Sequence, residues 1–280
     1  MVSVVFHKSM ADFFEVHEVF LETNYFLVYP LLEVIGSSDR DNLKISAAFN
    51  LSDGNSLVVG IQAGPFLLLY SVNWNEAILD EIEKVVPFNK MRGDIFFSGT
   101  YELITELLNR SGKKYQEISA RNVYECRQLN SGVRISPGEV GRATLADVER
   151  IADLSFEFQK DEYGDRNPHD REYMLEYVVA PGIKKGNIVK WTFEGEIVSI
   201  AQVMIDEENK PIIGHFFTDP AYRGKGYGTS LIWNATNSIL KDFDVCGLVT
   251  KVSNVTANAI FRRVGFEQKY RWVKASFVSS

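Results

Sequence analysis

The segment TDPAYRGKGYG, residues 218–228, carries the strongest structural signal in this sequence. It follows a β-branched and aromatic run, IIGHFFT (212–218), and precedes an amphipathic run, TSLIWNATNSIL (229–240). Its closely spaced glycines permit positive φ angles and let backbone amides approach a ligand without obstruction by a Cβ atom. Amides at the start of a helix attract anions, and Arg223 and Lys225 add positive charge. The segment therefore predicts a phosphate-binding loop between a strand and a helix.

The residue order in this loop excludes two common phosphate-binding motifs. A P-loop ends in Gly-Lys-Ser or Gly-Lys-Thr, which does not follow the required spacer here. The dinucleotide-binding fingerprint follows the first strand of a parallel sheet. In this chain the pattern Arg-x-x-Gly-x-Gly, residues 223–228, follows the third strand of an expected meander.

A second motif, NVTANAIFRRVGF, lies downstream at residues 254–266. Together the two motifs resemble those of the GNAT N-acetyltransferase superfamily, in which the first loop binds the pyrophosphate of acetyl-CoA. The resemblance covers roughly residues 138–275. It implies an α/β (mixed α+β) fold with a central, mostly antiparallel sheet flanked by helices. It also implies a set of residues that bind acetyl-CoA as co-substrate: Phe216, Phe217, Thr218, Arg223, Gly224, Lys225, Gly226, Tyr227, Gly228, Thr229, Asn254 and Phe261.

The length of 280 residues favours two domains. Turn-forming residues cluster near Asn130, which predicts a domain of residues 1–130 and a catalytic domain of residues 131–280. Both parts give the same expected order of elements: helices, three strands, helix, strand, helix, strand. The first part lacks the glycine loop after its third strand. It therefore resembles a degenerate GNAT-like unit that binds no cofactor, as in bacterial two-domain acetyltransferases and the FR47-like group.

Local signals place several of these elements. A helical region at 9–35 is expected to be interrupted at Asn24 and Pro30, and Asp53-Gly54 predicts a β-hairpin. Thr144 and Asp147 are spaced like a helix N-terminal capping arrangement. A later helix at 170–180 is expected to end at Pro181-Gly182.

Charge and composition limit the function classes. The formal net charge is −7, which argues against general nucleic-acid binding. Residues 223–280 contain 9 basic and 3 acidic residues, a local net charge of +6 that suits a small anion. The most apolar window, 56–72, is broken by glycines and a proline, so we expect no membrane span. We expect a cytoplasmic monomer or homodimer that acts on a small-molecule amine, without metal, nucleic acid or membrane.

The resemblance implies that an amine attacks the thioester of acetyl-CoA, and several residues are candidates for the proton transfers. Glu157, Glu162 and His215 are candidate bases, although each has a structural alternative, as a surface acid or a core histidine. A backbone amide near Phe217 is the expected donor to the thioester carbonyl. Phe261 stands where many members have a tyrosine, so the candidate acids are Tyr227 and Tyr270. A catalytically silent acyl-CoA sensor or interaction module remains the alternative.

Replacing a loop glycine by aspartate tests this interpretation. Gly226→Asp or Gly228→Asp is expected to abolish binding of acetyl-CoA, because a carboxylate would occupy the position of the pyrophosphate. Arg223→Ala is expected to weaken binding less, because backbone amides supply most of the contacts. Isothermal calorimetry measures both effects, and an unchanged affinity in the aspartate variants would refute the assignment.

Overall fold

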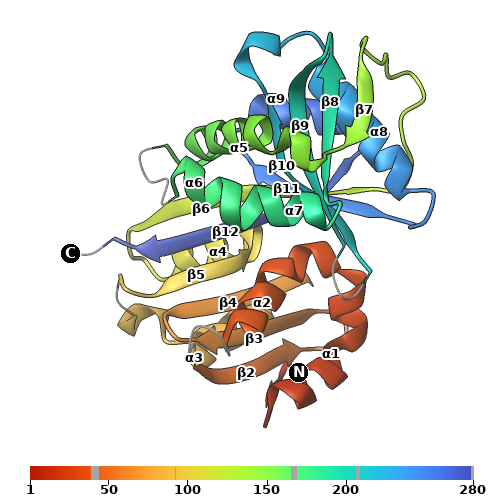
Figure 1. Ribbon diagram of the computed structural model, residues 1–280. Helices are drawn as coiled ribbons and strands as arrows, with labels where there is room; N and C mark the ends of the chain where they lie inside the picture. Colours follow the sequence, from red (N-terminus) through yellow and green to blue (C-terminus); the bar gives the residue numbers. More distant parts are fainter. Residues whose placement is uncertain (39–43, 92, 165–168, 206–208, 279–280) are drawn as a thin grey trace. The chain divides into compact units, whose positions relative to one another are not determined.

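The structure is a computed structural model that describes residues 1–38, 44–91, 93–164, 169–205 and 209–278. The chain forms two compact units. Unit 1 contains Met1–Val123 and Lys269–Ser280, and unit 2 contains Tyr124–Gln268. In each unit helices cover both faces of the β-strands, which confirms the expected mixed α/β class (Figure 1).

Unit 1 has a mostly antiparallel sheet in the order β1-β2-β3-β4-β5-β12-β6, in which β4 and β5 run parallel. Its strands are β1 (Ser3–Phe6), β2 (Ile45–Ser52), β3 (Leu57–Ala63), β4 (Phe66–Asn73), β5 (Phe96–Thr100), β6 (Tyr115–Cys126) and β12 (Glu267–Phe277). Its helices are α1 (Met10–Thr23), α2 (Tyr25–Ser38), α3 (Glu76–Val85), the short 3₁₀ helix η1 (Phe88–Lys90) and α4 (Tyr101–Arg110).

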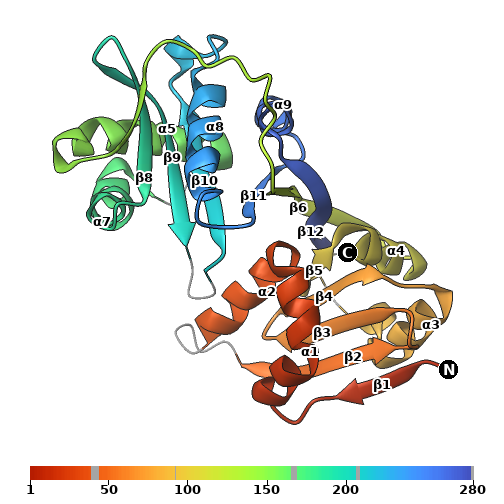
Figure 2. The same cartoon turned by 90° about the vertical axis from the view of Figure 1, so that its right-hand side faces the viewer.

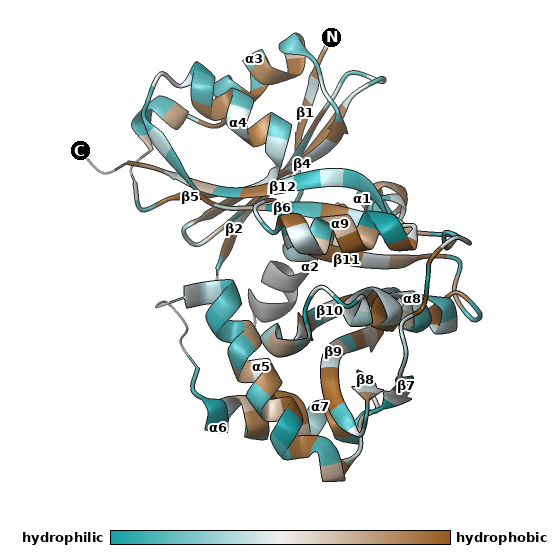
Figure 3. Cartoon of the chain, turned by 90° about the horizontal axis from the view of Figure 1, so that it is seen from above, coloured by the Kyte–Doolittle hydropathy of each residue, from teal (hydrophilic) through white to brown (hydrophobic). Residues whose placement is uncertain are grey.

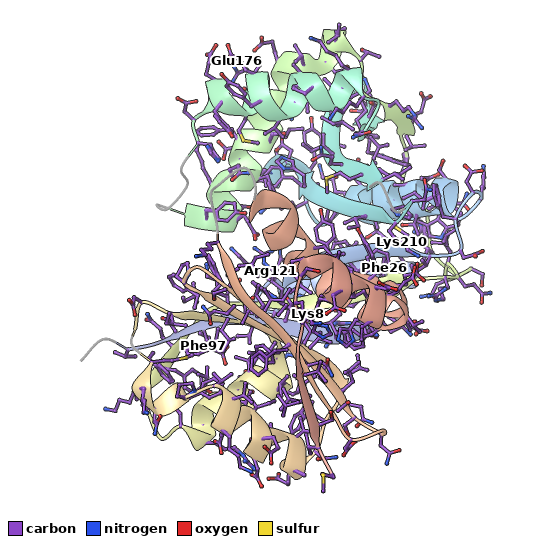
Figure 4. All side chains as sticks on the ribbon, turned by 90° about the horizontal axis from the view of Figure 1, so that it is seen from below. Lys8, Phe26, Phe97, Arg121, Glu176 and Lys210 are labelled. Carbon is purple, nitrogen blue, oxygen red and sulfur yellow. The ribbon has the colours of Figure 1, made fainter. Side chains whose placement is uncertain are left out.

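Two apolar clusters hold the helices of unit 1 against its sheet. Helices α1 and α2 cover one face and α3 and α4 cover the other (Figure 2). Phe97 on β5, labelled in Figure 4, is fully buried on the α3 and α4 side, where its ring lies 4.9 Å from that of Phe277 on β12. The last strand of the chain is therefore part of the first unit's core.

Two local expectations for unit 1 are corrected. The edge strand β1 has no counterpart in the sequence prediction, because its four residues precede the helical pattern too closely to show a separate alternation. Asn24 does end α1, but Pro30 lies inside α2 and does not interrupt it. Phe26, Leu27 and neighbouring apolar side chains of α2 are buried, and we attribute the continuous helix to this packing, which outweighs the loss of one backbone hydrogen bond. The hairpin at Asp53-Gly54 is confirmed by the pairing of β2 with β3.

Unit 2 has a sheet in the order β11-β10-β9-β8-β7, with the end of β6 beside β11. Its strands are β7 (Glu139–Arg142), β8 (Ile188–Phe193), β9 (Glu196–Ile205), β10 (Pro211–Thr218) and β11 (Cys246–Lys251). Its helices are η2 (Leu145–Asp147), α5 (Val148–Tyr163), α6 (Arg171–Tyr173), the π-helix η4 (Met174–Val179), α7 (Ala180–Lys184), η5 (Pro220–Tyr222), α8 (Tyr227–Ile239) and α9 (Val255–Val264).

Helices α5 to α7 cover one face of this sheet, and α8 and α9 cover the other (Figures 1 and 2). Strand β9 is coloured largely hydrophobic in Figure 3, and its residues 197–201 are all buried. The predicted capping arrangement is present, because the Thr144 and Asp147 side chains each accept a hydrogen bond from the other residue's backbone N–H. The helix expected to end at Pro181-Gly182 continues to Lys184, because Pro181 occupies the first turn of α7, where a missing N–H is tolerated.

The π-helix η4 is not visible in the sequence. Met174 and Val179 are buried within it, whereas Glu176, labelled in Figure 4, lies on the outer side. A π-turn widens the helix by one residue, which shifts the apolar spacing away from the regular helical period.

The division of the chain differs from a single cut at residue 130. Strand β12 of the second half pairs with β5 in unit 1, with Trp272 opposite Thr100. The end of β6, from Tyr124, belongs to unit 2. Strand β12 thus comes from the second half of the sequence but belongs to unit 1, an arrangement that local sequence patterns cannot reveal because any strand of suitable hydrophobicity can pair with β5.

Gly99 on β5 allows a close approach that no other residue would permit. It has φ +147°, and a Cβ atom there would lie 1.7 Å from the Leu69 carbonyl oxygen. We expect Gly99→Ala to lower the free energy of unfolding by at least about 3 kcal/mol, because the β4–β5 backbone pairing would have to separate. Gly54→Ala is the matched control, since Gly54 also has a positive φ but a Cβ atom there would meet no other atom within 4 Å. Urea unfolding measures both, and equal losses would contradict the expectation.

Candidate functional site

Strands β10 and β11 pair in parallel only at their beginnings. The register joins Ile212 to Gly247 and Ile213 to Leu248, and among the described residues no further pair continues it. A β-bulge then inserts one extra residue into β10, because Gly214 faces Gln202 and Phe217 faces Ile200 on β9. His215 in this bulge has φ +48°. The bulge redirects β10 at the point where the pairing with β11 ends.

The loop after β10 leads directly into α8. Gly224 and Gly226 have φ values of +79° and +83°, and Gly226 is the N-terminal cap of the helix. A Cβ atom on Gly228 would lie 2.7 Å from Thr218 Oγ1 and 2.8 Å from Phe216 Cζ. Glycine is therefore required at 226 by backbone conformation and at 228 by lack of space.

A cavity of about 390 Å³ lies at this loop. Ten of the twelve predicted cofactor residues line it: Phe216, Phe217, Thr218, Arg223, Gly224, Gly226, Tyr227, Gly228, Thr229 and Asn254. The other lining residues are Phe158, Asp161, Glu162, Tyr222, Thr256, Ala257, Ile260 and Arg263. The structure thus gathers the two sequence motifs and the end of α5 around one space.

Two predicted cofactor residues do not line the cavity. The Lys225 ammonium lies 5.1 Å from the centre of the Tyr222 ring. Phe261 is 4% exposed, and its ring packs 5.8 Å from Phe216 and 6.0 Å from Phe266 in the apolar cluster under α8 and α9. Phe261 is therefore a core residue that packs behind Phe216, which lines the cavity.

Several cavity residues are absent from the sequence prediction, although the sequence contains a signal for some of them. Thr256, Ile260 and Arg263 follow Asn254 at helical spacing and so share one face of α9. Asp161 and Glu162 lie one turn after Phe158 on α5. Glu162 is predicted from its place beside the α5–α6 loop, but Asp161 is not, because nothing in the sequence shows which acid turns inward. Residues 165–168 of that loop lie outside the described residues.

Arg223 is oriented by three contacts in this structure. Its guanidinium donates to Asp161 Oδ2 at 2.7 Å and to the Thr218 carbonyl at 2.9 Å, and it lies 5.0 Å from the centre of the Phe217 ring. Asp161 is exposed, so an anion in the cavity could exchange with this carboxylate at little cost. Asn254 caps α9 by accepting from the Ala257 N–H at 3.1 Å.

The three base candidates occupy different environments. Glu157 is exposed, pairs with Lys160 at 2.7 Å and does not line the cavity. Glu162 lines the cavity and lies 3.5 Å from the Lys251 ammonium. His215 is outside the lining, with its ring 4.3 Å from Phe158, and its Nε2 atom is buried without a hydrogen-bond partner. Burial lowers the pKa of His215 to about 4, so the imidazole is neutral near neutral pH.

The two acid candidates lie in different units. Tyr227 starts α8, lines the cavity and packs 5.0 Å from the Phe193 ring. Burial and the charge of Glu194 raise the pKa of Tyr227, so its phenol remains protonated. Tyr270 belongs to unit 1, where its hydroxyl donates to Asn24 Oδ1 at 2.7 Å. The structure therefore gives Tyr270 a hydrogen-bonding role in that unit.

In the described part of the chain, no three or more His, Cys, Asp or Glu side chains are grouped so that they could hold a metal ion. Of the helices among those residues, none is both long enough and apolar enough to cross a membrane.

Comparison with known families gives one match that includes the site. Residues 147–266 match the family model of the acetyltransferase (GNAT) family, and this range includes the bulge, the glycine loop, α8 and α9. None of the curated sequences compared with the chain is significantly similar to it.

Solved structures agree with the GNAT fold. A GNAT-family acetyltransferase from Colwellia psychrerythraea superposes with a TM-score of 0.60 at 9% identity, covering 99% of this chain and 100% of that one. A Drosophila protein gives 0.52 at 12% identity, covering 99% and 98%. A GCN5-related N-acetyltransferase from Sphaerobacter thermophilus gives 0.50 at 15% identity, covering 83% and 82%. At these identities the likeness concerns the fold.

The depressed pKa of His215 predicts a pH-dependent stability. Because the pKa falls from 6.5 to about 4 on folding, the unfolded chain binds the proton more tightly. The free energy of unfolding should decrease by about 3 kcal/mol as the pH falls from 6.5 to 4 through this residue. His215→Asn, which tolerates a positive φ but does not titrate, should remove that part of the pH dependence. An NMR titration of the imidazole checks the pKa directly, and a value near 6.5 would contradict the burial argument.

Proposed function

We propose that this protein is an N-acetyltransferase that transfers the acetyl group of acetyl-CoA to a primary amine of a small molecule. The observation that carries the proposal is the glycine loop before α8, which lines the same cavity as the bulge in β10 and the start of α9. The family match of this segment supports acetyl transfer as the reaction class.

The cavity suits the two chemical parts of acetyl-CoA. The N-terminal amides of α8 and the positively charged Arg223 and Arg263 would bind the pyrophosphate. The pantetheine arm would occupy the opening where β10 and β11 cease to pair, with its amides hydrogen-bonded to free strand edges as an added strand would be. A backbone N–H near Phe217 would then donate to the thioester carbonyl.

Glu162 is the base that we favour. It lines the cavity, whereas Glu157 points to solvent and His215 lies behind Phe158. A histidine with a pKa of about 4 is also a weak proton acceptor near neutral pH. In the proposed step the amine nitrogen attacks the thioester carbon, its proton passes to Glu162, the C–S bond breaks and the thiolate leaves. The thiolate then takes a proton either from Tyr227, which lines the cavity and stays protonated, or from solvent.

The charge of the cavity wall supports an amine as the acceptor. Asp161 and Glu162 lie on the side formed by α5, where they pair with Arg223 and Lys251; a cofactor phosphate that takes over Arg223 would free the Asp161 carboxylate. This arrangement attracts a cationic ammonium group to one side and an anionic cofactor to the other.

We further propose that unit 1 is a degenerate, FR47-like GNAT unit that binds no acetyl-CoA. It has the same order of elements, including a parallel β4–β5 pair, but β4 runs into α3 without a glycine loop. The Asn75 side chain accepts from the Ile78 N–H at 3.1 Å, and Glu76 adds a negative charge to the first turn. Both features oppose binding of a phosphate at this helix.

A thiol-release assay with acetyl-CoA and a panel of small amines tests the function. Wild type should release free CoA only when a productive amine is present. Glu162→Gln should reduce kcat at least about tenfold, because the base is lost. Glu157→Gln is the matched control on the same helix and should retain wild-type activity.

Two outcomes would contradict the proposal in different ways. Equal activity of wild type and Glu162→Gln would exclude Glu162 as the base. Binding of acetyl-CoA without turnover of any amine would favour the silent acyl-CoA-binding module, an alternative that the buried Phe261 in place of a tyrosine supports.

A further inference from the structure

Ser136 joins the glycine loop to a distant part of unit 2. It lies in the connection between β6 and β7 and precedes Pro137. Its hydroxyl donates to the Lys225 carbonyl at 2.8 Å, and its backbone N–H donates to Ser230 Oγ at 2.8 Å. The Ser230 hydroxyl in turn donates to the Gly226 carbonyl at 3.0 Å. Two consecutive carbonyls of the loop are therefore held by this pair of serines.

The contact with Lys225 fixes the direction of one peptide group. The described residues contain no cis peptide bond, so the carbonyl of Lys225 and the N–H of Gly226 point in opposite directions. Since the carbonyl is turned toward Ser136, the N–H of Gly226 is turned away from it. Gly226 lines the cavity and Ser136 does not, which places that N–H on the cavity side.

Without the serine this peptide group would have freedom to rotate. Its rotation changes ψ of Lys225 and φ of Gly226, and Gly226, with φ +83°, has no Cβ atom to oppose such a change. A rotated peptide would present the Lys225 carbonyl oxygen to the cavity. A carbonyl oxygen repels a phosphate oxygen, whereas an N–H donates to it.

Ser136 is itself held in place. The Pro137 carbonyl accepts a hydrogen bond from Trp191 Nε1 at 3.2 Å, and Trp191 is 2% exposed. A Cβ atom on Gly138 would lie 2.5 Å from that same nitrogen, so the chain passes close to the indole. The anchor at Trp191 keeps the Ser136 hydroxyl at a fixed distance from the loop.

We propose that Ser136 is a positioning residue for the pyrophosphate of acetyl-CoA, acting by holding the Lys225–Gly226 peptide with its N–H toward the cofactor. The inference rests on the proposed function. Ser136 does not contact the cofactor, and its effect is confined to the part of acetyl-CoA that contains the diphosphate.

The test compares two acetyl donors, acetyl-CoA and acetyl-pantetheine, which lacks the diphosphate. Ser136→Ala should raise the KM for acetyl-CoA about tenfold with kcat unchanged, because one hydrogen bond to a charged group is misdirected. The KM for acetyl-pantetheine should stay at the wild-type value. Ser136→Thr keeps the hydroxyl and should restore the affinity for acetyl-CoA, and Ser131→Ala, in the same connection, is the matched control.

Ser230→Ala provides a second variant that removes the partner hydroxyl and should give the same donor-selective loss. The proposal would be overturned if Ser136→Ala matched wild type with acetyl-CoA, or if both variants lost affinity equally for the two donors. A wild-type protein that bound neither donor would overturn the proposed function as well. These outcomes are distinct, because the first two require a wild type that binds acetyl-CoA.

Discussion

The architecture of unit 2 depends on one constraint, that backbone N–H groups must be presented to a cavity while the chain turns from a strand into a helix. This constraint requires glycine at 226, where φ is positive, and at 228, where Phe216 and Thr218 leave no space for a side chain. It also requires β10 to change direction before the loop, which the bulge at His215 achieves. At that bend the Nε2 atom of His215 is buried without a hydrogen-bond partner, which is unfavourable.

Most of the cavity-lining loop could be predicted from the sequence, because the positions of its glycines indicate the backbone conformation. The loop 223–228 and the cap at Asn254 are local features, so their residue types reveal them directly. Glu162, by contrast, was one of three equivalent candidates, and only the packing of α5 distinguished it from Glu157. Ser136 could not be predicted, because the role of a serine in an irregular connection depends on its contact with a loop that is far away in sequence.

The sequence predicted the fold well where the hydrophobic residues of an element have a clear period. It predicted the fold poorly where tertiary packing determines the length or the pairing of an element. The β2–β3 hairpin and the amphipathic helices α3 and α4 follow their local patterns. Pro30 and Pro181 were both misjudged as helix breaks, the first because α2 is buried along the sheet and the second because it begins a new turn. Tertiary structure determines that β12 pairs with β5, and no local property of the β12 sequence encodes this pairing.

The position of β12 in unit 1 has a consequence for biosynthesis. Unit 1 lacks an inner strand of its sheet until residues 267–277 have left the ribosome, although all its other strands come from the first 126 residues. During translation the nascent chain must therefore hold β5 with an unpaired edge while residues 127–266 are made. Completion of unit 1 is thereby coupled to the synthesis of β12, so a polypeptide that stopped before residue 267 would lack an inner strand of the sheet of unit 1.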